Sequence, residues 1–455
     1  MNVPSYALDA IARLNAAGFD AWLVGGCVRD SLMGRVPEDY DVTTSAPPEQ
    51  TEAVFAGERL IETGLKHGTV TVLLDGSPLE ITTYRRDGGY SDHRHPDEVL
   101  FTPRLEDDLA RRDFTVNAMA WNPTDGLVDC FGGQKDLADG IIRCVGDPER
   151  RFDEDALRIL RALRFSSVLG FALEPETHRA ARAKKDSLSL VSRERIAAEL
   201  VKLLCGLDVV RVLTTCWDIL AVPLPELAAM AGFDQHSRYH CYDVLTHCAV
   251  AVGAVPPEPA LRLAALFHDA GKPACFTRDP DGAGHFYGHA KVSARLAQDA
   301  LTRLRFDRET VTRVTTLVGL HDVPLEFPGA ERDRAVKRQL RRLGEADFFR
   351  LLDLKRADAL AHAPQYRSRT LTCDRAAETA RRILAEQQCF SLKDLAVNGT
   401  DLIAAGVPEG PVIGRILNNL LEAVIAGEAA NEKQALLSRA ADLAAAVRTA
   451  EKTTD

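Results

Sequence analysis

The sequence predicts an α+β protein with a mixed sheet near its N-terminus and a mostly helical remainder. In the runs 69–74 and 79–84, β-branched residues alternate with others in the manner of paired strands, and Asp75-Gly76 between them is a hairpin signal. After Val145 the apolar spacing changes from a strand period to a helix period. Long stretches rich in Ala, Leu, Arg and Glu favour helices there.

A chain of 455 residues is too long for a single hydrophobic core. The change of apolar period places a boundary near residue 145, and together with the motifs described below it leads us to expect four regions. These are a mixed α/β head at 1–145, a helical neck at 146–215, a third helical region at 216–330 and a helical tail at 331–455.

The composition excludes several classes of protein. There is no run of about 18 apolar residues, so we expect no membrane span. The N-terminus lacks the pattern of a secretory signal, and ten cysteines without a C-x-x-C pair indicate reduced thiols in a cytoplasm. A net charge of −10 argues against bulk binding of nucleic acid, but 150–195 and 332–342 are locally basic. Those two segments are either RNA-binding faces or solvated helix faces. The sequence carries no signal for the oligomeric state.

The first elements place a glycine pair after a short strand. Residues 4–17 have the apolar spacing of an amphipathic helix, and the apolar run 21–24 predicts a buried strand. Gly25-Gly26 then allows a ligand to approach the backbone, and the amides of the following helix start point at an anion. Arg29, next to Asp30 on that helix, can add a bidentate grip on phosphate.

Two carboxylates follow at a spacing of two residues. In a strand, Asp39 and Asp41 face the same side, and their mutual repulsion is relieved by a cation between them. A hard divalent ion such as Mg²⁺, shared with substrate phosphates, suits oxygen ligands. Glu80, on the strand at 79–84, is a candidate third acidic neighbour or a solvent-facing residue. The plain alternative for the pair is a turn followed by a solvated acidic loop.

The order GG…RD followed by DYD resembles the signature of the polymerase-β-like nucleotidyltransferases. The longer match resembles the bacterial class II CCA-adding enzymes and their poly(A) polymerase relatives, which extend RNA without a nucleic-acid template. The resemblance implies a nucleotidyltransferase head and nucleotide binding by Gly25, Gly26, Arg29 and Asp30. It implies Mg²⁺ at Asp39 and Asp41, and transfer of CMP and AMP from CTP and ATP to the 3′ end of tRNA.

A second motif follows the polar segment 85–96, which we expect to be a loop and whose His93 and His95 we interpret as loop residues. The run RRDFTVNAM begins at Arg111. The resemblance implies that Arg112, Asp113 and Asn117 hold the ribose and triphosphate of the incoming nucleotide. Asn and Asp can pair with ribose hydroxyls, and Arg with phosphate. An ordinary ion pair between Arg111 and Asp113 is the alternative.

The third motif is the run 151–165, which predicts one helix with a polar stripe. The stripe contains Asp155, Arg158, Arg161 and Arg164, all assigned here to nucleotide binding. The resemblance implies that Glu154, Asp155 and Arg158 match the Glu-Asp-x-x-Arg amino-acid template of CCA-adding enzymes.

A template made of side chains has a direct physical account. An aspartate only accepts hydrogen bonds, so it selects the exocyclic amine of cytosine or adenine and rejects the carbonyl of uracil or guanine. Arg158 can donate to ring acceptors on the same edge. The alternative is an i, i+3 ion pair on an exposed helix, worth only about 0.3 kcal/mol.

The third region carries a second pattern of candidate ligands. The order of His247, His268-Asp269 and Asp322 resembles the ligand order of HD-type phosphohydrolases, so we call 216–330 the HD-like region. His289 and His321 are candidate extra ligands. Imidazoles with carboxylates suit Ni²⁺, Mn²⁺, Zn²⁺ or Fe, and a bound ion would activate water. The alternative is a helical domain without a productive metal site.

The tail from Leu392 onward resembles the tRNA-contacting module of the same family. Three rival functions remain at this point. They are a poly(A) polymerase or an enzyme limited to CC or the final A, an HD-type phosphohydrolase whose head only binds nucleotide, and a non-catalytic RNA-binding protein. Asp39, Asp41 and Asp113 weigh against the last of these.

Overall fold

The computed structural model describes residues 1–455 except 62–67, 89–98, 281, 326 and 453–455. The chain divides into two compact units. The first contains 1–231, 257–262 and 299–308, and the second contains 232–256, 263–298 and 309–455. The division does not test the four predicted regions, which stay predictions; the first unit contains the predicted head and neck.

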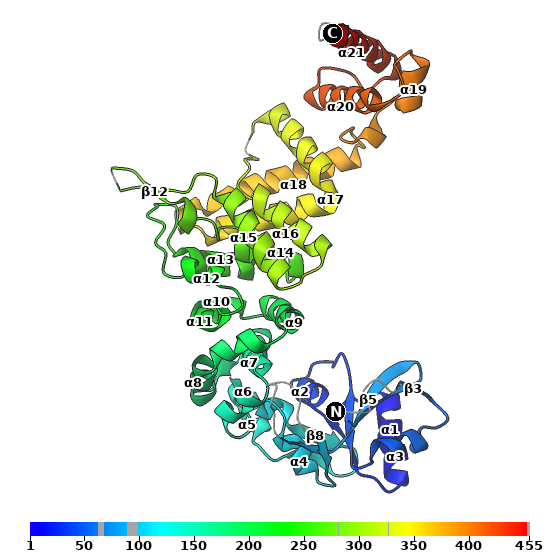
Figure 1. The fold of residues 1–455 in the computed structure, drawn as a ribbon, viewed down its shortest axis with the longest axis vertical. Coiled ribbons are helices and arrows are strands. Elements are labelled where there is room, and N and C mark those ends of the chain that lie inside the picture. Colours follow the sequence, from blue (N-terminus) through cyan, green and yellow to red (C-terminus); the bar gives the residue numbers. More distant parts are fainter. Residues whose placement is uncertain (62–67, 89–98, 281, 326, 453–455) are drawn as a thin grey trace. The chain divides into compact units, whose positions relative to one another are not determined.

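A mixed sheet of seven strands organises the head, in the order β3-β4-β5-β2-β1-β8-β9 (Figure 1). Its pairs are antiparallel except for β2 and β5, which are parallel. The strands are β1 Ala21–Val24, β2 Asp41–Thr44, β3 Arg59–Ile61, β4 Thr69–Leu74, β5 Ser77–Thr83, β8 Met119–Asn122 and β9 Gly126–Asp129. The predicted hairpin joins β4 to β5, and Asp75 (φ 50°) and Gly76 (φ 78°) form its turn.

Period-2 alternation gives each face of this sheet its own core. Leu23 and Val42 face a core that includes Ile11 and Leu14 of the N-terminal helix. Trp22 and Val24 face the opposite core. The head helices are α1 Ser5–Ala16, α2 Gly26–Leu32, α3 Pro48–Val54, α4 Leu105–Ala110 and α5 Gly133–Asp139, with a 3₁₀ turn η2 at Thr115–Asn117.

Two small sheets flank these elements. Strand β6 Arg85–Asp87 pairs with β7 Val99–Phe101, so the segment expected to be a loop begins as a strand. Residues 89–98, with His93 and His95, lie outside the described residues. Strand β10 Ile141–Ile142 pairs with β11 Ala172–Leu173.

Helices continue the first unit after the sheet. They are α6 Pro148–Glu154, α7 Leu157–Leu169, α8 Pro175–Ala183, α9 Arg193–Leu204, α10 Val209–Thr215, α11 Trp217–Leu220 and α12 Glu226–Met230. The single helix predicted over 151–165 is wrong, because Asp155 adopts an extended conformation (φ −144°, ψ 105°) between α6 and α7.

The second unit is helical, apart from a short pair of strands, β12 Thr277–Arg278 and β13 Gly284–His285. Three helices, α14 Pro259–Phe267, α15 His289–Arg303 and α16 Arg308–Leu320, carry residues of both units. The others are α13 Val244–Ala254, α17 Gly329–Ala361, α18 Thr370–Ala385, α19 Gly399–Ala404, α20 Pro411–Ala426 and α21 Lys433–Lys452. Gly344 (φ 74°) interrupts α17.

The predicted α+β class is confirmed. Among the described residues, no helix is both long and apolar enough to cross a membrane.

Candidate active site

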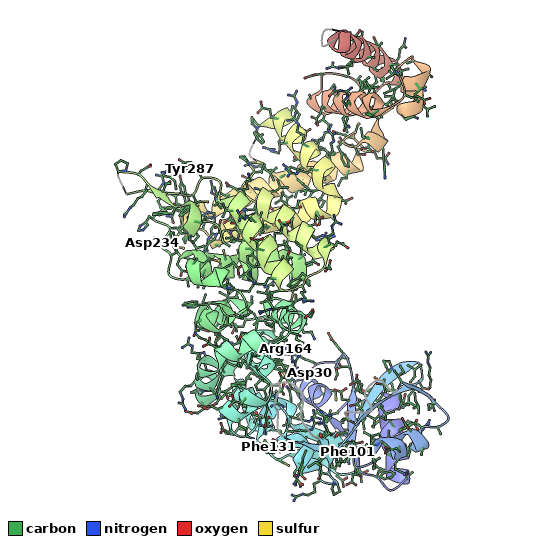
Figure 2. The ribbon with its side chains drawn as sticks, viewed as in Figure 1. Asp30, Phe101, Phe131, Arg164, Asp234 and Tyr287 are labelled. Atoms are coloured by element: carbon green, nitrogen blue, oxygen red, sulfur yellow. The ribbon has the colours of Figure 1, made fainter. Side chains whose placement is uncertain are left out.

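A cavity of about 720 Å³ lies between the head sheet and the neck helices of the first unit. Figure 2 labels two of its lining residues, Asp30 from α2 and Arg164 from α7. The structure brings together most of the residues singled out from the sequence. Those lining the cavity are Gly25, Gly26, Arg29, Asp30, Asp39, Asp41, Arg112, Asp113, Asn117, Arg161 and Arg164.

The glycine turn leaves room for an arginine. Gly25 has φ +81°, a conformation that side-chain-bearing residues rarely adopt. A Cβ at this position would lie 3.2 Å from Nη1 of Arg112. Gly25 therefore allows the turn between β1 and α2 and leaves space for the guanidinium group of Arg112 in the cavity.

The carboxylates lie at the start of β2. Asp41 is the first residue of this strand, and Asp39 lies two residues earlier and lines the same cavity. In the parallel register of β2 and β5, Asp41 pairs with Glu80, so the candidate third acid lies beside it. Burial, and then the charges of Asp39 and Glu80, raise the pKa of Asp41 to about 6. Asp39 and Asp41 both line the cavity, and a pair of carboxylates of this kind fits a hard divalent cation; Glu80 is exposed and does not line the cavity.

A chain of hydrogen bonds connects the motifs of head and neck. Nη1 of Arg29 donates to Oδ1 of Asn117 (2.6 Å), and Nδ2 of Asn117 donates to Oδ1 of Asp113 (3.1 Å). Arg161 of α7 donates twice to Oδ2 of Asp113, at 2.8 and 2.5 Å. Burial alone would raise the pKa of Asp113, but Arg161 outweighs it and holds the pKa at about 2. Asp113 is therefore ionised, and it fixes Arg161 toward the cavity.

Phe165 is a lining residue that the sequence analysis missed. The guanidinium carbons of Arg29, Arg161 and Arg164 lie 5.1, 5.5 and 4.1 Å from the centre of its ring. Its position one turn after Arg161 was the signal, because residues four apart share a helix face. Other lining residues that were missed include Arg35, Glu38 and Lys202.

The structure does not place the expected template residues in the cavity lining. Oδ2 of Asp155 contacts Nη2 of Arg195 (2.7 Å), and its Oδ1 accepts from the backbone N–H of Leu157 (3.0 Å). Nη1 of Arg158 contacts Oε2 of Glu154 (2.6 Å). The expectation that Asp155 and Arg158 share one exposed helix face is wrong, because α7 begins after Asp155 and both side chains are mostly buried.

A second group of polar side chains is buried in the second unit. At the centre of this group, Oδ2 of Asp269 lies 3.3 Å from Nε2 of both His247 and His268. The other oxygen, Oδ1, lies 3.2 Å from Nε2 of His289 and 3.6 Å from Nε2 of His321. One carboxylate thus joins two candidate metal sets, which are His247, His268, Asp269 and Asp358, and Asp269, His289 and His321. We call these residues the histidine cluster.

The predicted ligand Asp322 is not part of the histidine cluster, because its side chain is exposed. Asp358 on α17 takes that place, with Oδ1 3.0 Å from Nε2 of His247. The sequence analysis missed Asp358 because one acid inside a 33-residue helix carries no spacing signal.

The other ring nitrogens of the cluster face backbone carbonyls. In each histidine, Nδ1 lies within hydrogen-bond distance of a backbone carbonyl oxygen. The pairs are His247 with Ala361 (3.3 Å), His268 with Ala265 (2.8 Å), His289 with Phe286 (2.8 Å) and His321 with Val318 (2.7 Å). This arrangement assigns the proton to Nδ1 and leaves Nε2 as a ligand, as in metal-binding histidines. Burial would lower the pKa of His268, but the charge of Asp269 beside it raises that pKa above its ordinary value.

Three family descriptions match parts of the chain. The Poly A polymerase head domain matches residues 21–143. The "Probable RNA and SrmB- binding site of polymerase A" matches 170–230, and the putative tRNA nucleotidyltransferase domain 2 matches 286–440.

Known proteins resemble the chain over its whole length. The CCA-adding enzyme of Geobacillus stearothermophilus is 36% identical over 431 residues, which is 94% of each protein. The chain belongs to the CCA-adding enzyme family. The CCA-adding enzyme of Lactobacillus helveticus is 50% identical over 200 residues, or 44% of this chain, and this match spans half of the relative's length. The crystal structure of the Bacillus stearothermophilus CCA-adding enzyme with CTP superposes with a TM-score of 0.72, at 31% identity and full coverage of both chains.

The raised pKa of Asp41 predicts a pH-dependent stability without divalent ions. A carboxyl with a folded-state pKa of about 6 and an ordinary value of 3.8 contributes stability only when protonated. That contribution is full below the ordinary value and is lost as pH rises through 6. In EDTA, Asp41→Asn should therefore raise the urea midpoint relative to the wild type, with a gain that grows between pH 4 and 6 and is constant above.

Asp75→Asn is the matched control, since it removes an exposed carboxylate of the same sheet. An equal gain in both variants, or a gain for Asp41→Asn that shrinks as pH rises, would contradict the assignment.

Proposed function

We propose that this chain adds CMP and AMP from CTP and ATP to the 3′ end of tRNA without a nucleic-acid template, releasing pyrophosphate. The observation that carries the proposal is the composition of the 720 Å³ cavity. The carboxylates of Asp39 and Asp41 line the same space as the arginines of the neck and of the second motif. Such a site can hold the metal and the triphosphate of one nucleotide together.

The carboxylates of Asp39 and Asp41 would hold Mg²⁺, with Glu80 beside them. A metal ion held there would lower the pKa of the attacking hydroxyl and neutralise charge on the leaving group. In the reaction the 3′ oxygen of the RNA forms a bond to the α-phosphorus, the bond to the β-phosphate breaks, and pyrophosphate leaves. The hydroxyl proton passes to solvent or to a carboxylate of the site.

The arginines supply the positive charge that a triphosphate requires. Arg112 and Arg164 line the cavity, and guanidinium groups bind phosphate oxygens bidentately. Asn117 and Asp113 are joined by a hydrogen bond and can pair with the ribose hydroxyls. These groups are fixed before substrate arrives, which limits the reorganisation needed on binding.

We assign base selection to Asp155 and Arg158, which must exchange partners to reach a base. Asp155 would leave Arg195, and Arg158 would leave Glu154, the contacts they make in this structure. Since the bonds exchanged are charge-assisted, the nucleotide has to offer equally good acceptors and donors. Cytosine and adenine do so for an aspartate, and uracil and guanine do not.

The nearest alternative is a poly(A) polymerase or an enzyme limited to CC or to the final A. The cavity would be the same in each, because the metal and the triphosphate are common to all these reactions. The number and order of nucleotides added to one tRNA distinguish them.

We also infer that the enzyme works in the cytoplasm. All ten cysteines are free thiols, which suits a reducing compartment.

The catalytic test uses tRNA transcripts that lack one, two or three 3′ residues, with each NTP, resolved on a sequencing gel. The wild type should restore CCA and stop. Asp39→Asn and Asp41→Asn should reduce addition by about 10³-fold or more, because the metal loses a charged ligand. Addition near the wild-type rate by either variant, with an unchanged circular dichroism spectrum, would exclude this site. Continued addition of AMP would favour the poly(A) alternative.

Asp155→Asn tests base selection and keeps the local structure. Asparagine still accepts from the N–H of Leu157, but its amide can also donate to the carbonyl of uracil. Discrimination against UTP is measured as the ratio of kcat/KM for CTP to kcat/KM for UTP. This ratio should fall by a factor that corresponds to about 1–3 kcal/mol. Arg195→Ala, which removes only the ion partner of Asp155, should leave the ratio unchanged. Equal loss for all four nucleotides in Asp155→Asn would mean that the residue only supports structure.

A second activity is favoured by the histidine cluster. We propose that it binds divalent Ni, Mn, Zn or Fe and hydrolyses phosphate esters, including 2′,3′-cyclic phosphates. The supporting observation is Asp269, whose two oxygens face two sets of imidazole nitrogens. Asp269 and the imidazoles on its two sides would hold the metal, which would activate water for phosphate hydrolysis.

Asp358→Asn and Asp322→Ala form a matched pair for this second activity. The wild type should retain metal after gel filtration, measured by mass spectrometry, and hydrolyse a 2′,3′-cyclic nucleotide. Asp358→Asn should lose at least one ion per chain and most of the hydrolysis, and Asp322→Ala should keep both. Absence of hydrolysis by the wild type with Mg²⁺, Mn²⁺, Ni²⁺, Co²⁺, Zn²⁺ and Fe²⁺ would leave the cluster a structural feature.

A further inference from the structure

A second cavity in the first unit is lined almost entirely by charged groups. Its volume is about 250 Å³, and it lies among β6, α4 and α6. Apart from Ala110, its lining consists of Arg86, Asp107, Arg111, Arg150, Arg151 and Glu154. Among the described residues it shares no lining residue with the 720 Å³ cavity. We call it the arginine cavity.

The arginine cavity carries an excess of positive charge. Four guanidinium groups and two carboxylates line it, and Arg111 is also paired with the buried carboxylate of Asp108 (2.8 Å). Four arginines against three carboxylates leave one positive charge in excess, although the whole chain has a net charge of −10. Both lining carboxylates are already engaged. Oε1 of Glu154 contacts Arg150 (3.3 Å) and Arg151 (3.0 Å), and Oδ2 of Asp107 contacts Arg86 (2.6 Å). Like charges held this close repel one another, and a bound anion relieves that repulsion.

Two of the arginines form a floor and two form a rim. The side chains of Arg111 and Arg151 are 18% and 11% exposed, whereas those of Arg86 and Arg150 are 58% and 73% exposed. An anion can therefore enter from solvent and still meet partly desolvated guanidiniums. Planar guanidinium groups match the oxygens of a phosphate, which makes phosphate the anion of best fit.

We propose that the arginine cavity is a second anion site, which binds a phosphate group. The phosphate has two sources in the proposed function, a phosphodiester of the RNA or free pyrophosphate. The anion site rests on the cavity itself, and only its RNA source rests on the proposed function.

The arginine cavity is connected to the proposed base-selecting residue. Nη2 of Arg158 donates to the carbonyl of Arg111 (3.0 Å), and its Nη1 donates to the carbonyl of Arg151 (3.1 Å). The carboxylate of Glu154, which Arg158 contacts, also lines the cavity. A phosphate bound here lies next to the supports of Arg158. The adjacent residues Arg111 and Arg112 face the two different cavities.

The test uses the double variant Arg86→Ala/Arg150→Ala. Both side chains are mainly exposed, so the fold should survive, and circular dichroism melting checks this. Arg179→Ala is the matched control, because Arg179 is 70% exposed on a helix of the same unit and pairs with Glu176 as Arg150 pairs with Glu154. Arg86→Lys/Arg150→Lys retains the charge.

The first arm measures binding of tRNA lacking its 3′ CCA as a function of KCl concentration. If RNA is the source, the double Ala variant should bind about tenfold more weakly, and the slope of log K against log salt should fall by about 1. The Lys variant should recover most of the affinity. The second arm titrates sodium pyrophosphate by calorimetry, and weaker binding only in this arm identifies free pyrophosphate as the source.

If the dissociation constants of the double Ala variant lie within twofold of those of the Arg179→Ala control in both arms, the anion site is overturned. That result leaves the proposed function intact if the variant still adds nucleotides. The opposite outcome has two parts: the wild type adds no nucleotides, and the double Ala variant binds pyrophosphate more weakly than the wild type. That outcome would support the anion site and contradict the proposed function.

Discussion

The repulsion among carboxylates at the start of β2 is the constraint on which the active-site region depends. The parallel register of β2 and β5 puts Asp41 opposite Glu80, and Asp39 lies nearby in the same cavity. A fold selected for stability alone would separate such groups, since each pairwise repulsion adds to the cost of burial. The head gathers them instead, an arrangement that the proposed divalent cation would relieve.

The neck supplies the opposite charge. Its position against the head depends on Asp113 and Arg161, a pair in which the acid is almost fully buried. Phe114 and Phe165 pack edge to face beside this pair, with ring centres 5.7 Å apart. Removing Arg161 would leave the nearly buried carboxylate of Asp113 without its cation. The same contact therefore fixes the neck against the head and orients an arginine toward the cavity.

Local pattern predicted the parts of this site that depend on near neighbours. The strand before Gly25 and the hairpin at Asp75-Gly76 both follow from spacings of a few residues. The break in the helix at Asp155 did not, because the helical period of 151–165 continues across it and the contact with Arg195 comes from 40 residues away. Asp358 was missed for a similar reason, because its partner His247 is 111 residues distant. Asp322 was favoured because the order of His247, His268-Asp269 and Asp322 resembles that of HD-type phosphohydrolases.

The most direct measurement of the central claim is Mn²⁺ binding followed by electron paramagnetic resonance, with and without a non-hydrolysable CTP analogue. If the carboxylates and the arginines hold one metal–nucleotide complex, the analogue should increase the affinity for Mn²⁺ by about tenfold or more in the wild type. Asp41→Asn should abolish that increase and leave the Mn²⁺ binding measured without the analogue at its wild-type level at sites other than β2. An increase of the same size in Asp41→Asn would contradict the account, because the nucleotide would then bind its metal away from β2.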